Sequence, residues 1–177
     1  MVSLIILIVL LIAFIWYYKN FKRIKLPNVF LCSGAVKGGK TGLSVYLAIR
    51  TYKKNLRQWY ISNFIIRLGK RLRLKAFKNK EINEFAPMLY SNMKLKGIKF
   101  NKFTKEILNY EVFIPNKSVV LLDEVSLLAD SMLYKDRKIN GRLTFFVKLF
   151  AHYTMGGTLI MNTQSIQDCH FSIFVKH

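Results

Sequence analysis

The chain has 177 residues, enough for one domain with a hydrophobic core but not for two. It carries 29 Lys and Arg against 9 Asp and Glu, a formal net charge of +20, yet 52% of its residues are hydrophobic. That hydrophobic content excludes an intrinsically disordered chain, and the charge predicts a polyanion, an anionic lipid surface or both as partners.

The first predicted element is an uncharged run of seventeen residues, Val2 to Tyr18 (VSLIILIVLLIAFIWYY). This length is near the lower limit for a helix that crosses a bilayer. Aromatic residues end the run and basic residues follow it, whereas none precedes it, so the positive-inside bias predicts an external N-terminus and a cytoplasmic body. A cleaved signal peptide has the opposite charge order. A buried core helix is the alternative, which the length and the charge asymmetry disfavour.

The rest of the chain predicts strands alternating with helices. Apolar runs that predict strands are Asn28–Ser33, Met88–Asn92, Val119–Leu122 and Thr158–Met161, and helical patterns include Thr41 to about Asn55 and Leu143–Tyr153. This alternation is typical of a parallel α/β sheet with flanking helices. We therefore expect a transmembrane helix at residues 1–18, a basic juxtamembrane linker at 19–27 and one α/β domain at 28–177.

A basic segment extends over residues 50–80, which contain eleven Lys or Arg and no acidic residue. Aromatic and aliphatic residues are interleaved with the charges, as on an amphipathic helix with a basic face. This segment could face the anionic cytoplasmic leaflet, contact DNA phosphates or form an ordinary solvated surface. The sequence leaves these three alternatives open, although so many uncompensated charges favour a polyanionic partner.

A glycine-rich loop follows the first strand and has the pattern G-x-x-x-x-G-K-T. Glycines allow its backbone to turn tightly and approach phosphate oxygens, and the amides of the loop and of the next helix point at the phosphates. A glycine turn with a surface lysine is the alternative, which the preceding strand and following helix disfavour. The predicted nucleotide-binding residues are Gly34, Ala35, Val36, Lys37, Gly38, Gly39, Lys40 and Thr41.

Two carboxylates end the strand VVLLDE, at Asp123 and Glu124. A buried strand that delivers an acid at its carboxyl end is expected to place it beside the loop after the first strand. Asp123 is then a ligand of Mg²⁺ together with the Thr41 hydroxyl, and Glu124 is the base that orients and deprotonates a water. Solvated acids at a strand end are the alternative. The glycine-rich loop upstream makes solvated acids the less favoured alternative.

Polar residues also end the strand Thr158–Gln164 (TLIMNTQ). An amide at this edge can hydrogen-bond the γ-phosphate or the catalytic water. We expect Gln164 in this sensor role, with Asn162 as the second choice.

These motifs in this order resemble the FtsK–HerA branch of P-loop ATPases, and more narrowly the zonular-occludens-toxin-like (Zot-like) assembly ATPases of filamentous phages. The resemblance covers about residues 28–168 and includes Tyr90-Ser91-Asn92 and Thr163-Gln164. It departs from the family at His152-Tyr153, where the family has His-Arg, and in the membrane helix, which the Zot-like proteins usually carry after the ATPase domain. A full core of this branch continues beyond the equivalent of His177, so we expect a minimal variant or a fragment.

The resemblance implies a membrane-anchored, Mg²⁺-dependent ATPase that uses ATP for phage DNA export, virion assembly or DNA translocation. Lys40, Glu124 and Gln164 are then the catalytic residues. The implied partners are further copies in a ring such as a hexamer, single- or double-stranded DNA or virion proteins, and the inner membrane of a bacterial host, with anionic lipid at the basic segment.

Ring ATPases complete each site with an arginine from a neighbouring subunit. Arg137 and Arg142 are the candidates here, with two surface arginines as the alternative. The alternative for the whole chain is a non-catalytic nucleotide-binding scaffold of membrane morphogenesis. A small nucleotide kinase is disfavoured by the Asp-Glu pair and by the membrane anchor.

Overall fold

A parallel sheet forms the centre of the molecule. A computed structural model describes residue 10 and residues 26–34, 38–125 and 137–164, and within them five strands lie in the order β1-β5-β4-β2-β3, every pair parallel. The predicted α/β class with a parallel sheet is confirmed. The strands are β1 (Val29–Ser33), β2 (Leu89–Ser91), β3 (Asn101–Lys102), β4 (Val119–Leu122) and β5 (Thr158–Thr163).

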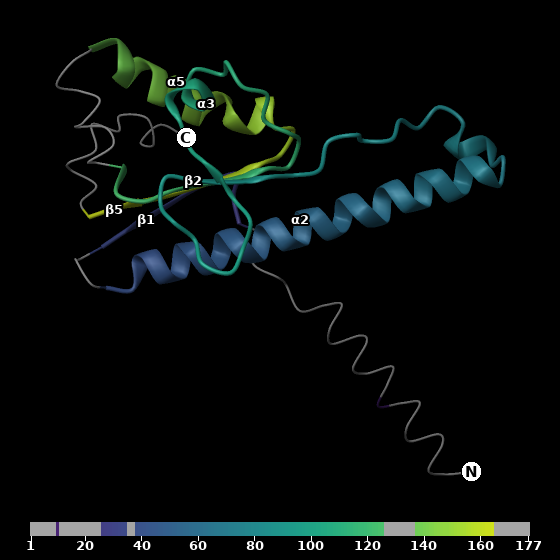
Figure 1. The fold of residues 1–177 in the computed structure, drawn as a ribbon, viewed down its shortest axis with the longest axis horizontal. Helices are drawn as coiled ribbons and strands as arrows, with labels where there is room; N and C mark the ends of the chain where they lie inside the picture. Colours follow the sequence, from purple (N-terminus) through teal and green to yellow (C-terminus); the bar gives the residue numbers. More distant parts are fainter. Residues whose placement is uncertain (1–9, 11–25, 35–37, 126–136, 165–177) are drawn as a thin grey trace.

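Helices cover both faces of the sheet (Figure 1). The helices are α2 (Lys40–Arg71), η1 (Lys75–Phe77), α3 (Lys105–Leu108) and α5 (Arg137–Tyr153). One face packs against α2, and the other packs against α3 and α5. The helix predicted from Thr41 and most of the basic segment form one continuous helix of 32 residues, because neither glycine nor proline interrupts its pattern between Gly42 in the first turn and Gly69.

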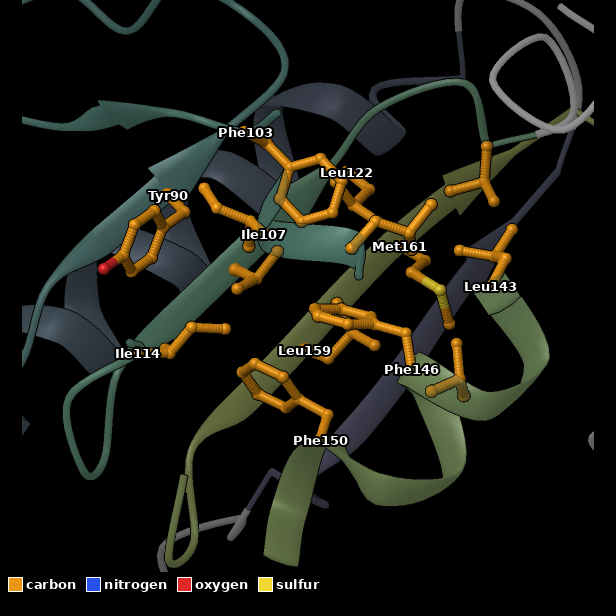
Figure 2. Packing of buried hydrophobic residues seen from close by; sticks show 14 residues of the cluster. Tyr90, Phe103, Ile107, Ile114, Leu122, Leu143, Phe146, Phe150, Leu159 and Met161 are labelled. Atoms are coloured by element: carbon orange, nitrogen blue, oxygen red, sulfur yellow. The ribbon is translucent and has the colours of Figure 1, made fainter. Parts of the chain in front are cut away.

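Alternation along β4 divides the core between these two layers. Val119 and Leu121 pack towards α2, whereas Val120 and Leu122 pack towards α5, and all four are fully buried. A strand buried on both faces is expected to be apolar throughout, which explains the run VVLL. Figure 2 shows the larger cluster, in which α5 contributes aromatic rings that lie against the side chains of β5.

Tyr110 fixes α5 to the turn that follows α3. Its ring stacks on Tyr153 with centroids 4.1 Å apart, and its hydroxyl donates a hydrogen bond of 2.9 Å to the Phe146 carbonyl. Burial raises the pKa of the Tyr110 hydroxyl, so this donor stays protonated at neutral pH.

The strand β5 lies between β1 and β4. Its register aligns Asn162 with Cys32 on one side and Met161 with Leu122 on the other. The residue after Leu122 is Asp123, which therefore leaves β4 beside Asn162. This arrangement brings polar residues from distant parts of the sequence to the carboxyl edge of the sheet.

None of the helices within the described ranges is both long enough and apolar enough to cross a bilayer. The transmembrane helix predicted at residues 1–18 lies outside those ranges except for Leu10, as does the linker before residue 26.

The second half of α2 projects past the sheet, and the chain returns along it through η1 (Figure 1). Asn63 holds the returning segment, because its side chain pairs with both backbone groups of one residue. Its amide donates 2.8 Å to the Asn83 carbonyl, and its carbonyl accepts 3.2 Å from the Asn83 N–H. The indole N–H of Trp59 donates to the same carbonyl at 2.9 Å. Asn63 itself is buried, whereas Asn83 is exposed.

We predict that Asn63→Ala loosens the returning segment from α2. Losing both bonds costs roughly 1–3 kcal/mol of unfolding free energy, because each hydrogen bond contributes about 0.5–1.5 kcal/mol. Thermal unfolding and hydrogen exchange across residues 81–85 measure the effect. Ser62→Ala is the matched control, since Ser62 is the exposed neighbour on the same helix and its change is expected to stay within about 0.5 kcal/mol. Equal exchange in the two variants would contradict the assigned role of Asn63.

Candidate functional site

The glycine-rich loop leads directly into the N-terminus of α2. Gly34 has a φ of 152° and Gly39, at the N-cap, has a φ of 75°. Residues that carry a side chain rarely adopt these φ angles, so glycine suits both ends of the loop. The Lys40 ammonium donates a hydrogen bond to the Gly34 carbonyl and so lies across the opening of the loop. The other predicted loop residues at 35–37 fall outside the described ranges, whereas Gly38 lies within them.

The first turn of α2 presents its N–H groups at the carboxyl edge of the sheet. The first hydrogen bond of the helix runs from the Leu43 N–H to the Gly39 carbonyl, at 3.0 Å. The N–H groups that precede Leu43 have no acceptor in the helix itself. A glycine-rich loop that leads into such a helix end suits an anion, which the helix dipole favours further.

The structure brings Thr41 and Asp123 together although 82 positions separate them. The Thr41 hydroxyl donates to Oδ1 of Asp123 at 3.3 Å. Thr41 is in the first turn of α2 and Asp123 follows β4. The sequence predicts this proximity from the carboxyl ends of parallel strands.

Asn162 joins the same group from β5. Its amide donates to Oδ1 of Asp123 at 2.8 Å and to the Ser44 hydroxyl at 2.7 Å. The Ser44 hydroxyl donates in turn to the Thr41 carbonyl at 3.0 Å. Asn162 is 2% exposed, and its Oδ1 is a buried acceptor with no partner among the described residues. A chain of polar contacts therefore links α2, the residue after β4 and β5 at the Asp123 carboxylate.

Asn92 fixes the backbone of Asp123. Its amide donates to the Asp123 carbonyl and its side-chain oxygen accepts from the Asp123 N–H, both at 2.8 Å. Asn92 follows β2, the strand that pairs with β4, so its carboxamide extends the ladder by one step. Two short hydrogen bonds, to the N–H and to the carbonyl of one residue, hold Asp123 in place where its own strand has ended.

Glu124 and Gln164 meet at the exposed rim of this edge. The Gln164 amide donates to Oε1 of Glu124 at 3.1 Å. Glu124 has a φ of 48°, in the left-handed region that residues other than glycine seldom occupy. Such a conformation costs on the order of 1 kcal/mol, and it is typical of positions where the surroundings dictate the backbone.

The two predicted arginines lie on the opposite face of the sheet from α2. Arg137 and Arg142 belong to the first two turns of α5, but the placement of their side chains lies outside the description. Since only a short turn separates α5 from β5, the helix runs back against that strand and begins near the carboxyl edge (Figure 1). Their role in a neighbouring subunit's site stays a prediction.

The donors at this edge suit a hard cation held jointly by protein and phosphate. Thr41 and Asp123 offer a hydroxyl and a carboxylate, the oxygen ligands that Mg²⁺ prefers, and Mg²⁺ usually binds through one or two protein groups together with waters and substrate phosphates. Within the described ranges, no three His, Cys, Asp or Glu side chains gather to hold a metal by themselves. The residues present therefore fit Mg²⁺ that arrives with a nucleotide.

Ser44 was not predicted from the sequence, and Asn92 was predicted only as part of the family resemblance. Ser44 is fully buried and lies three residues after Thr41, so the two occupy adjacent positions on one helix face. That spacing is the sequence signal from which Ser44 could have been predicted. The contact between Asn92 and Asp123 has no signal in the sequence, because it depends on the pairing of β2 with β4.

Comparison with known proteins found no match to a family model, to a curated protein or to a solved structure.

We predict that Glu124→Gly is more stable than Glu124→Ala by about 1 kcal/mol. Both substitutions remove the carboxylate and its bond to Gln164, but only glycine accepts the φ of this position without strain. Chemical denaturation of the two variants measures the difference. The offsetting effect is the larger freedom of glycine in the unfolded chain. A more stable alanine variant would contradict the left-handed backbone conformation assigned to position 124.

Proposed function

We propose that this protein binds and hydrolyses ATP with Mg²⁺ at the carboxyl edge of its sheet. The observation that carries the proposal is the contact between the Thr41 hydroxyl and the Asp123 carboxylate at 3.3 Å. It joins the end of the glycine-rich loop to the acid that follows β4. An anion site and a carboxylate that meet in this way suit a metal–phosphate ligand better than either feature alone.

Each residue then has a distinct role. Lys40 and the amides of the loop and first helical turn bind the β- and γ-phosphates, and Thr41 with Asp123 holds the Mg²⁺ that neutralises phosphate charge. Ser44, Asn92 and Asn162 position the Asp123 side chain and backbone.

The position of Glu124 favours ATP hydrolysis over nucleotide binding without hydrolysis. Its carboxylate lies at the rim where water can reach it, and Gln164 donates to it at 3.1 Å. We assign Glu124 as the base that orients and deprotonates water, and Gln164 as the group that senses the γ-phosphate. A protein that only binds nucleotide needs no carboxylate held there in a strained conformation.

The cellular role that we propose is ATP-driven export of phage DNA, virion assembly or DNA translocation at a bacterial inner membrane. Its support is the motif order that resembles the FtsK–HerA and Zot-like ATPases, the net charge of +20 and the apolar run at residues 2–18. We further propose that Arg137 or Arg142 completes the site of a neighbouring copy in a ring.

We predict that the purified full chain hydrolyses ATP and that Lys40→Ala and Glu124→Gln abolish turnover. Loss of a general base alone lowers the rate by about 10²–10⁴-fold. Phosphate release measures hydrolysis, and binding of a fluorescent ATP analogue measures affinity. Glu124→Gln is expected to keep its affinity, whereas Lys40→Ala loses it. Lys148→Ala, an exposed lysine on α5, is the control and stays unchanged.

Nucleotide binding without turnover in the unmodified protein, with DNA and membrane both present, would favour the morphogenesis scaffold instead. Absence of both binding and turnover would remove the proposal altogether.

We also predict that Thr41→Ala weakens Mg²⁺-dependent nucleotide binding at least about tenfold, because removal even of a group that only supports a metal ligand has effects of this size. Thr41→Ser keeps the hydroxyl and is expected to retain most of the affinity. Titrations with Mg²⁺ and with a chelator separate the metal-dependent part. Equal Mg²⁺ dependence in both variants would exclude Thr41 as a metal ligand.

A further inference from the structure

The projecting half of α2 exposes a continuous apolar surface. Six of its large side chains are each between 44% and 65% exposed, and we call them the docking face: Tyr60, Ile61, Phe64, Ile65, Leu68 and Leu72. Exposed apolar residues scattered singly are ordinary, but a contiguous group of them marks an interaction site.

Helix geometry places all six on one side. They follow one another at spacings of one, three or four residues, and at about 100° per residue they project within an arc of roughly 140°. The other side of the helix is already covered: Asn63 and Gly69 are buried there, and the ring of Phe77 packs against Gly69. The docking face therefore points away from the segment that returns along α2.

Positive charge surrounds the docking face. Exposed basic residues lie on α2 before and between these apolar residues, at Lys53, Lys54, Arg57, Arg67, Lys70 and Arg71. No acidic residue occurs anywhere in residues 1–80. The binding partner must therefore accept both large apolar side chains and a dense positive charge.

We propose that the docking face lies in the surface of an anionic lipid bilayer. Several of the basic residues, among them Arg57 and Arg71, project within the same arc as the apolar side chains. Such a surface binds in the interface, with the apolar chains inserted at the headgroup boundary and the long basic side chains extended to anionic headgroups. DNA would satisfy the charges but leaves the apolar side chains in water. A second copy of this surface would bring like charges together.

The helix lies on the bilayer and does not cross it, since α2 carries eight basic residues and does not qualify as a membrane span. At about 1.5 Å per residue, the 32 residues of α2 form a rod about 48 Å long. Its N-terminus carries the phosphate-binding loop. Docking of the far half therefore sets the distance and orientation of the candidate site relative to the membrane. This inference does not depend on nucleotide hydrolysis.

The test uses an environment-sensitive fluorophore on single cysteines in the full chain, with Cys32→Ser and Cys169→Ser in the background. Phe64→Cys labels the docking face, and Ser62→Cys labels an exposed position on the same helix outside the arc. Each protein is reconstituted into vesicles of phosphatidylcholine alone or of equal parts phosphatidylcholine and phosphatidylglycerol. Circular dichroism verifies that each variant is folded.

We expect the label at position 64 to shift to the blue and to be quenched by spin-labelled lipid only in the anionic vesicles, while the label at position 62 stays unchanged. Replacing Arg57, Arg67 and Arg71 by Gln should lower the ratio of docked to free helix on the order of 100-fold, since each basic residue near an anionic surface contributes about a fivefold effect. High salt should act in the same direction.

Three results would overturn the proposal. One is no shift at position 64 in anionic vesicles, and another is an equal shift in phosphatidylcholine alone. The third is a shift that appears in detergent without lipid and grows with protein concentration or with added DNA, which would assign the face to a second copy or to nucleic acid.

Discussion

The carboxylate of Asp123 is the group on which the arrangement of the carboxyl edge depends. It accepts hydrogen bonds from Thr41 on α2 and from Asn162 on β5, and its backbone is held by Asn92 after β2. A partly buried charge is tolerated only where donors surround it, so the elements that supply those donors must meet at this point. The same contacts that satisfy the carboxylate also bring the first turn of α2, Asp123 and the end of β5 together.

Two asparagines use the same device at different places. Asn92 pairs with both backbone groups of Asp123, and Asn63 pairs with both backbone groups of Asn83. A carboxamide holds N–H donors and an acceptor oxygen side by side, so it can bond to both the N–H and the carbonyl of one residue where no neighbouring strand is available. One pair fixes the candidate site and the other fixes the segment returning along α2.

The continuous helix α2 connects two surfaces of different chemistry. Its first turn lies at the glycine-rich loop, its middle packs against the sheet through residues such as Ala48, and its far half carries the docking face. Because a helix of this length is stiff, whatever the far half binds also determines where the first turn lies. The apolar and basic side chains of the far half therefore influence where the candidate site lies without contacting it.

Local pattern alone identified the parallel α/β class, the strand Val119–Leu122 with the bounds that the structure gives it, and the meeting of Thr41 with Asp123. These features follow from short-range sequence signals: an apolar run, a glycine pattern, and acids at a strand end. Only the tertiary structure decided that β5 lies between β1 and β4, that Asn162 therefore bonds to Asp123, and that the predicted helix at Thr41 continues to Arg71. It also decided that the six apolar residues on the projecting half of that helix stay exposed. Strand order and exposure are set by which surfaces pack together over long distances in the chain, and no local run of residues encodes that choice.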